Sequence, residues 1–305
     1  MAIDVRAALK EGMARLRASK VLSYTLAAEL LLMHALDRDR TWLFTYPENP
    51  LDPATAEKYF ALVARRAAGE PTQYLTGKQE FWGLEFEVTP AVLIPRPETE
   101  HLIEVALERL GERGIKIDMK TGAESPRLHI ADIGTGSGCL AVALAHELPH
   151  ARIVATDISA PALEIARRNA GRHGVSGRIR FVQTNLLDGI SASPADIDRP
   201  PQRFDLIVSN PPYIAHTDAP SLPTEVRDHE PRSALFGGPT GGEIYARLIE
   251  QAGAQLGPGG ILVLELGYNS AEAVREMLHD ERHWAHLRIT NDLAGIPRVI
   301  AAERV

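Results

Sequence analysis

The sequence has a single cysteine among 305 residues, Cys139, and no surplus of positive charge. One cysteine excludes an internal disulfide, and because no CxxC pair or His/Cys cluster has metal-ligand spacing, we expect no metal site. The net charge of -7 gives no electrostatic footprint for DNA or for an anionic membrane. We therefore expect neither direct nucleic-acid binding nor membrane binding.

The sequence also lacks a long apolar run. Glu29 and His34 interrupt the apolar residues 27–35, and charged residues punctuate the amino terminus, so neither a membrane span nor a signal peptide is indicated. A cytoplasmic location follows by default. With 45% hydrophobic and 24% charged residues, the chain is expected to fold as two globular domains. We expect it to act as a monomer.

The first part of the chain has helical spacing. Apolar residues recur with helical period over residues 5–18, 24–36 and 53–68, with Ser23 and Asp52 placed as N-caps of the last two segments. This predicts a small N-terminal helical domain over residues 1–77. Residues 81–94 read as extended around the Gly83 turn signal, which predicts a hairpin linker over residues 78–96.

The remainder, residues 97–305, alternates strand-like and helical segments. A helix should begin at residues 97–100, and polar, irregular connections are expected at 114–126 and 190–202. Alternation predicts an α/β fold with a mainly parallel sheet between helices. Because the last two strands have no room for a crossover helix between them, they should be antiparallel. The seven predicted strands are residues 128–133, 152–156, 178–183, 204–209, 261–266, 287–290 and 299–302.

Four consecutive residues carry the most specific chemistry: Asn210, Pro211, Pro212 and Tyr213, directly after the fourth of these strands. Open α/β sheets bind ligands at such carboxyl ends. Prolines have no N–H to donate, so backbone carbonyls and the Asn210 side-chain oxygen can accept hydrogen bonds from a conjugated NH2 group. If Asn210 and Pro211 each accept one N–H of an amide, they orient its nitrogen for attack, with Tyr213 against the amide plane. No general base is placed by the sequence.

A glycine-rich loop supplies the second signal. Gly134, Gly136 and Gly138 follow the first strand of the sheet, where glycine lets the backbone approach a cofactor closely. Cys139 stands where a dinucleotide fingerprint would have its third glycine. Asp157, 19 positions after Gly138, ends the second strand, and its carboxylate can accept both hydroxyls of a ribose. Asp132 can contact the cofactor's amino group or simply fix the loop.

The loop and the Asn-Pro-Pro-Tyr tetrad together resemble S-adenosylmethionine-dependent methyltransferases that act on amide or amino nitrogens. Nearly the whole chain resembles the HemK/PrmC family, the peptide chain release factor glutamine methyltransferases. The residues that carry this resemblance are 71–77, Glu80, Phe81, Gly83, 94–100, Glu225, Val226, Glu230, Pro231, Ala234, Leu235, Gly237, Gly238, Leu264, Glu265 and Gly267.

The resemblance implies a seven-stranded, Rossmann-like class I methyltransferase sheet and methylation of the glutamine of a Gly-Gly-Gln motif in release factors. It implies that the helical domain docks the release factor. It assigns catalysis and substrate binding to the tetrad. We expect Arg96 to touch substrate, or backbone near the site. The cofactor-binding set it implies is Asp132, Gly134, Thr135, Gly136, Ser137, Gly138, Asp157, Asn185, Leu186 and Asn210. Asn185 and Leu186 depart from the acid and aromatic that are usual in the family, which affects the adenine contact.

Rival functions stay open at this point. A ribosomal-protein glutamine methyltransferase is less favoured because that branch usually has Pro-Arg-Ser-Pro where this chain has Pro95, Arg96, Pro97 and Glu98. An adenine-specific nucleic-acid methyltransferase would use the same tetrad but should add a basic face. A nicotinamide dehydrogenase leaves the tetrad idle, and a binding module needs no sulfonium pocket.

Overall fold

The computed structural model describes residues 3–115, 127–190, 203–280 and 282–305 of the chain. The predicted irregular connections at 114–126 and 190–202 lie almost entirely outside these residues. The chain forms two compact units, one of Met1–Lys78 with Leu222–His229, the other of Gln79–Ser221 with Glu230–Val305. Within the described residues, no helix is both long and apolar enough to cross a membrane.

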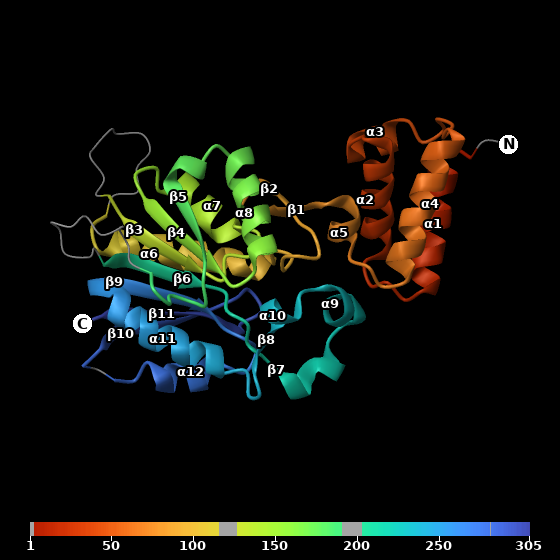
Figure 1. Cartoon of the computed structure of the whole chain (residues 1–305). Coiled ribbons are helices and arrows are strands. Elements are labelled where there is room, and N and C mark those ends of the chain that lie inside the picture. The colour runs from red at the N-terminus through yellow and green to blue at the C-terminus, as the bar shows by residue number, and fades with distance from the viewer. Residues whose placement is uncertain (1–2, 116–126, 191–202, 281) are drawn as a thin grey trace. The chain divides into compact units, whose positions relative to one another are not determined.

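The first unit is a group of helices around its own core (Figure 1). Two predicted helices have the bounds expected, α1 (Val5–Ala18) and α2 (Tyr24–Leu36), and α4 (Pro53–Ala67) ends one residue early. Asp52 caps α4 by accepting from Thr55 N, whereas Ser23 occupies the N-cap of α2 without a side-chain hydrogen bond. The sequence did not indicate three short helices, α3 (Arg40–Thr45), α5 (Thr72–Thr76) and α9 (Thr224–His229).

The segment that contains α9 belongs to this first unit although it follows the tetrad in the chain. Arg66 of α4, whose side chain is largely buried, donates to the Glu225 carboxylate of α9. No periodic pattern in the sequence indicates this return of the chain, because the contact joins residues 159 positions apart.

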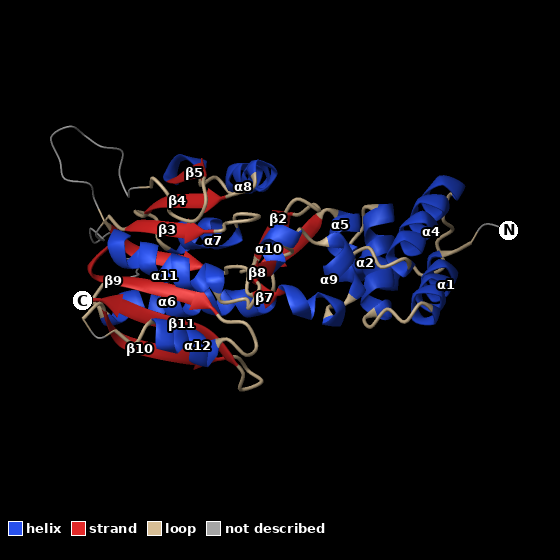
Figure 2. Ribbon diagram, turned by 60° about the horizontal axis from the view of Figure 1, so that its bottom comes forward, coloured by secondary structure: helices blue, strands red, loops and turns tan. Residues whose placement is uncertain are grey.

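The second unit contains the seven-stranded mixed sheet, which confirms the predicted fold class (Figure 2). Its strand order is β10-β11-β9-β6-β3-β4-β5. Neighbours pair in parallel from β9 through β5, and the last two strands are antiparallel to each other, as predicted. The bounds are β3 (His129–Ile133), β4 (Arg152–Asp157), β5 (Ile179–Gln183), β6 (Phe204–Ser209), β9 (Leu256–Glu265), β10 (Trp284–Asn291) and β11 (Pro297–Arg304).

Helices cover both faces of this sheet. Alternate residues of the central strands point to opposite faces and pack into two separate hydrophobic clusters. Leu206 and Val208 of β6 pack into one cluster with α6 (Glu100–Glu112), α7 (Cys139–Glu147) and part of α8 (Ala160–Arg172). Ile207 packs into the other cluster with α11 (Glu243–Gln255) and α12 (Ala271–Met277). A sheet apolar on both faces requires this double cover.

Smaller elements surround the sheet. The predicted hairpin is β1 (Lys78–Phe81) and β2 (Leu84–Glu87), joined through Trp82 and Gly83, both of which have positive φ. The predicted helix start is a 3-10 turn, η1 (Pro97–Thr99), that leads into α6. The sequence did not indicate the small parallel pair β7 (Ile214–Ala215) and β8 (Phe236–Gly238). The remaining elements are η2 (Ser176–Arg178), η3 (His216–Ser221) and α10 (Arg232–Leu235).

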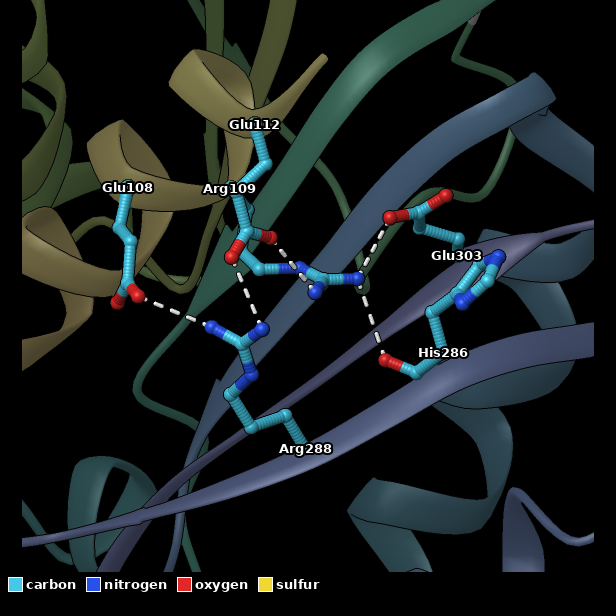
Figure 3. Close-up of polar contacts among 6 residues, drawn as sticks. All are labelled: Glu108, Arg109, Glu112, His286, Arg288 and Glu303. Carbon is cyan, nitrogen blue, oxygen red and sulfur yellow. Dashed lines mark hydrogen bonds and ion pairs between the residues drawn. The ribbon is translucent and has the colours of Figure 1, made fainter.

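A charged network fastens α6 to the edge of the sheet (Figure 3). Arg109, 4% exposed, donates to the Glu303 carboxylate at 2.6 Å and to the backbone carbonyl of His286 at 3.2 Å. His286 has φ +51 and lies in an irregularity of the β10 pairing, which turns its carbonyl toward the arginine. Glu112 joins Arg109 to Arg288, with Nη1···Oε2 and Nη2···Oε1 distances of 2.9 Å.

Candidate active site

The glycine loop adopts a conformation that only glycine tolerates well. Gly134, Gly136 and Gly138 have φ of +71, +54 and +83. At Gly138, which caps α7, a Cβ would lie 3.0 Å from Cβ of Ala166, so this position also lets α8 approach. At Gly134 and Gly136, a Cβ would meet no atom within 4 Å and would extend into the pocket that both residues line.

Asp132 lies beneath the loop and is fully buried. Its Oδ2 accepts from the Thr135 hydroxyl at 2.6 Å and from Ala141 N at 3.1 Å, which ties the loop to the first turn of α7. Burial raises the pKa of Asp132 to about 7. The sequence left open whether Asp132 contacts the cofactor's amino group or fixes the glycine loop. The contacts with Thr135 and Ala141 are ones that fix the loop. Thr135 and Ser137 are also buried, and none of these three lines the pocket.

Asp157 ends β4 and faces the pocket. Its Oδ2 accepts from Gly136 N and its Oδ1 from Ser159 N, both at 2.9 Å. Desolvation by burial raises the pKa of this carboxyl, and the two N–H donors oppose that rise. Each oxygen has a further lone pair, so the carboxylate can accept hydroxyl groups as well.

The pocket has a volume of about 200 Å³ and lies at the carboxyl ends of the central strands. It brings together Gly134, Gly136, Asp157, Asn185, Leu186, Asn210 and Pro212 from the set predicted by the sequence. Asp157 is the only ionisable side chain among the described residues that line it. No signal in the sequence assigns these further lining residues to the site: Ala91, Val92, Leu93, Ile158, Ser159, Ala162, Thr184, Pro231, Ser233, Ala234, Phe236 and Ile244. Pro231 and Ala234 are among the residues that carry the family resemblance, and Phe236 lies between two others, Leu235 and Gly237.

The tetrad has a defined backbone orientation. A Cβ on Gly237 would lie 2.5 Å from the carbonyl oxygen of Pro212, and a Cβ on Gly241 would lie 2.4 Å from that of Tyr213. Those two carbonyls are therefore covered by glycine backbone from the β8 region. The carbonyl of Pro211 is not among these glycine contacts. Pro211 is buried and does not line the pocket, so its role as an acceptor for a substrate N–H stays a prediction.

Tyr213 and Arg96 lie outside the pocket lining. The Tyr213 ring packs on Gly267, where a Cβ would come within 2.7 Å of Cδ2, and its hydroxyl is 3.4 Å from Glu265 Oε1. Arg96 donates to the buried carboxylate of Glu230, directly before the pocket residue Pro231. No group of three or more potential metal ligands occurs in the part of the chain that the structure describes.

Comparison with known proteins gives consistent matches. The family model "PrmC N-terminal domain" matches residues 7–77, and "Methyltransferase small domain" matches residues 116–225. A "Release factor glutamine methyltransferase" of Koribacter versatilis is 43% identical over 99% of both chains. Proteins with the same description are 42% identical in Moorella thermoacetica, over 99% of both chains, and 46% identical in Chlorobaculum tepidum, over 95% of this chain and 94% of that protein.

Among solved structures, the hMettl16 catalytic domain in complex with a 3′UTR hairpin superposes with a TM-score of 0.55. It is 19% identical and the match covers 80% of this chain and 81% of that one. At this identity, the likeness concerns the methyltransferase fold alone.

Proposed function

We propose that this chain, which belongs to the release factor glutamine methyltransferase family, methylates the side-chain amide nitrogen of the glutamine in the Gly-Gly-Gln motif of peptide chain release factors, with S-adenosylmethionine as methyl donor. The observation that carries the proposal is one pocket lined by the glycine loop, by Asp157 and by Asn210. Such a pocket offers a cofactor cradle and an amide-binding side chain side by side.

The residues present fit S-adenosylmethionine. Side chains at Gly134 and Gly136 would fill pocket space, so the glycines leave room for a ligand against the backbone. Asp157 has lone pairs for the ribose hydroxyls, and Asn185 and Leu186 line the neighbouring wall, where we place the adenine. Asn185 brings no charge to that wall, in contrast to the acid usual in the family.

S-adenosylmethionine supplies an electrophilic methyl group on a sulfonium. Asn210 Oδ1 and the carbonyl of Pro211 each accept one N–H of the substrate amide, which aims the nitrogen lone pair and enriches its electron density. The nitrogen would receive that methyl group in exchange for one N–H proton, which would pass to water. Asp157, the one ionisable side chain among the described pocket residues, is engaged with two backbone N–H groups, so catalysis rests on positioning.

The helical unit is proposed to dock the release factor. It has a hollow of about 590 Å³ lined partly by Leu22 and Leu26, which are 96% and 53% exposed, and by Lys20. Exposed leucines beside a cation suit a protein surface better than a small metabolite. Replacing Leu22 and Leu26 by Ser should raise KM for the release factor at unchanged turnover, whereas Phe44→Ser, which alters an exposed aromatic outside this hollow, should not.

The function is tested by incubating the protein with methyl-labelled S-adenosylmethionine and, separately, a release factor, ribosomal proteins or DNA. Peptide mass spectrometry should place the label on the glutamine of Gly-Gly-Gln, and a release factor with that glutamine replaced by asparagine should stay unlabelled. Label found only on a ribosomal protein or on an adenine base would reject the proposal. A monomeric state, a cytoplasmic location and the lack of direct nucleic-acid binding also remain predictions.

A further inference from the structure

Three buried or half-buried side chains form a chain of hydrogen bonds behind the pocket. Thr99, at the end of η1, is 3% exposed and donates its hydroxyl to Glu265 Oε2 at 2.6 Å. Asn210 Nδ2 donates to the same Thr99 oxygen at 3.1 Å. Glu265, the last residue of β9, is 2% exposed. Segments 111 and 166 positions apart thus meet at one hydroxyl group.

Because a hydroxyl group has a single hydrogen, the hydrogen bonds that join Asn210, Thr99 and Glu265 have a fixed donor-to-acceptor direction. Thr99 has one hydroxyl hydrogen. When the Glu265 carboxyl group is ionised, its oxygen can only accept that hydrogen, so Oγ1 has only lone pairs to offer to Asn210. Only the NH2 end of the Asn210 amide can then face Thr99. The oxygen of the same amide is directed away from Thr99, and Asn210 lines the pocket.

Glu265 is itself held in place. The Tyr245 hydroxyl donates to its backbone carbonyl at 2.7 Å, and the Tyr213 hydroxyl lies 3.4 Å from Oε1. Glu265, which accepts the Thr99 hydrogen, is therefore held at the end of β9 by these two tyrosines.

We propose that Thr99, oriented by Glu265, is a positioning residue that fixes the Asn210 amide with its oxygen toward the substrate nitrogen. This inference rests on the proposed function. With the Asn210 amide reversed, its NH2 group would face the NH2 group of the substrate glutamine, and two donors would meet. A threonine that can only accept prevents that reversal, so the role of Asn210 depends on a residue that does not line the pocket.

The test compares Thr99→Val, which keeps the shape and removes the hydroxyl, with Thr99→Ser, which keeps the hydroxyl. Single-turnover methylation of the release factor and the Kd for S-adenosylmethionine are measured for both. Thr99→Val should lower turnover roughly 10- to 100-fold with Kd changed less than about threefold, and Thr99→Ser should stay within about threefold of the wild type. Ser209→Ala removes another buried hydroxyl bond, to Ile133 O at 2.7 Å, and controls for loss of stability.

Unchanged turnover of Thr99→Val, or an equal loss in Thr99→Ser, overturns the positioning role. If Thr99→Val does not bind the cofactor, Glu265→Gln tests the positioning role instead. A glutamine can turn its own NH2 group toward Thr99, which would reverse the direction of the hydrogen bonds from Glu265 through Thr99 to Asn210. Turnover of Glu265→Gln equal to the wild type then overturns the role, and a loss of tenfold or more supports it. Failure of the proposed function is distinct from these outcomes, because the wild-type protein would then leave the release factor unlabelled.

Discussion

Replacing Glu265 with glutamine should change how the free energy of unfolding depends on pH. Burial raises the pKa of Glu265 from its ordinary 4.5 to about 7 in the folded protein. Thr99 and Tyr213, by hydrogen bonds, and the charge of Arg298 oppose this rise, while the charge of Glu98 adds to it. A carboxyl group with a raised pKa binds its proton more tightly in the folded state than in the unfolded state.

The sign follows from this difference. The stabilising contribution of protonated Glu265 is complete below pH 4.5 and is lost as the pH rises through 7. At 1.36 kcal/mol for each tenfold change in proton affinity, the full loss is about 3 kcal/mol. About 2 to 3 kcal/mol of it falls between pH 5 and pH 8.5.

Urea denaturation of both proteins at several pH values measures the effect. Glu265→Gln should match the wild type near pH 5 and be more stable than it by about 2 to 3 kcal/mol at pH 8.5, because the neutral amide has no charge to bury. Glu164→Gln, on the exposed face of α8, should leave the pH dependence unchanged. A difference between Glu265→Gln and wild type that stays constant from pH 5 to 8.5 would refute the reasoning.

Three further variants test the pocket. Asp157→Ala should weaken S-adenosylmethionine binding roughly 100-fold by isothermal calorimetry, because about 3 kcal/mol of hydrogen bonding to a charged group is lost. Asn210→Ala should reduce methyl transfer at least roughly 100-fold in single-turnover assays while leaving cofactor binding largely intact, because it removes an aiming acceptor. Gly237→Ala should lower turnover more than roughly tenfold, because its Cβ would displace the carbonyl of Pro212.

Each of these variants has a control and a contrary result. Asp205→Ala removes a carboxylate that accepts the His129 N–H near the amino ends of the central strands β6 and β3, and it should leave cofactor affinity unchanged. An equal effect of both aspartate variants would place the ribose elsewhere. Retained turnover of Asn210→Ala would reject its aiming role. Gly111→Ala, in α6 with no atom within 4 Å of the new Cβ, should leave turnover unchanged. If Gly237→Ala is as active as Gly111→Ala, the position of the Pro212 carbonyl does not matter for turnover.

Local patterns predicted the parts of the fold whose cause is local. The bounds of α1 and α2, the Asp52 cap and the antiparallel pairing of β10 with β11 follow from periodicity, capping and connection length. The glycine loop and Asn210 could be placed in one pocket because both follow strands of a parallel sheet.

Contacts between distant segments could not be predicted in this way. Nothing in the sequence around Thr99 indicates that its hydroxyl meets Glu265, because a helix start and a strand end have no shared period. The salt bridge of Arg109 with Glu303 likewise depends on how α6 packs on the sheet edge. The sequence predicts that Tyr213 packs on the substrate amide. Its contact with Gly267 joins two segments 54 positions apart, which no local pattern indicates.

The return of Leu222–His229 to the helical unit means that the unit is not encoded by one continuous stretch. A fragment cut after Lys78 would keep Arg66 but lose Glu225, and so would leave a largely buried guanidinium without that carboxylate. An isolated version of this unit therefore has to carry residues 222–229 as well, joined through a linker. In evolution, too, shuffling of the amino-terminal helices alone would separate them from a piece of their own fold.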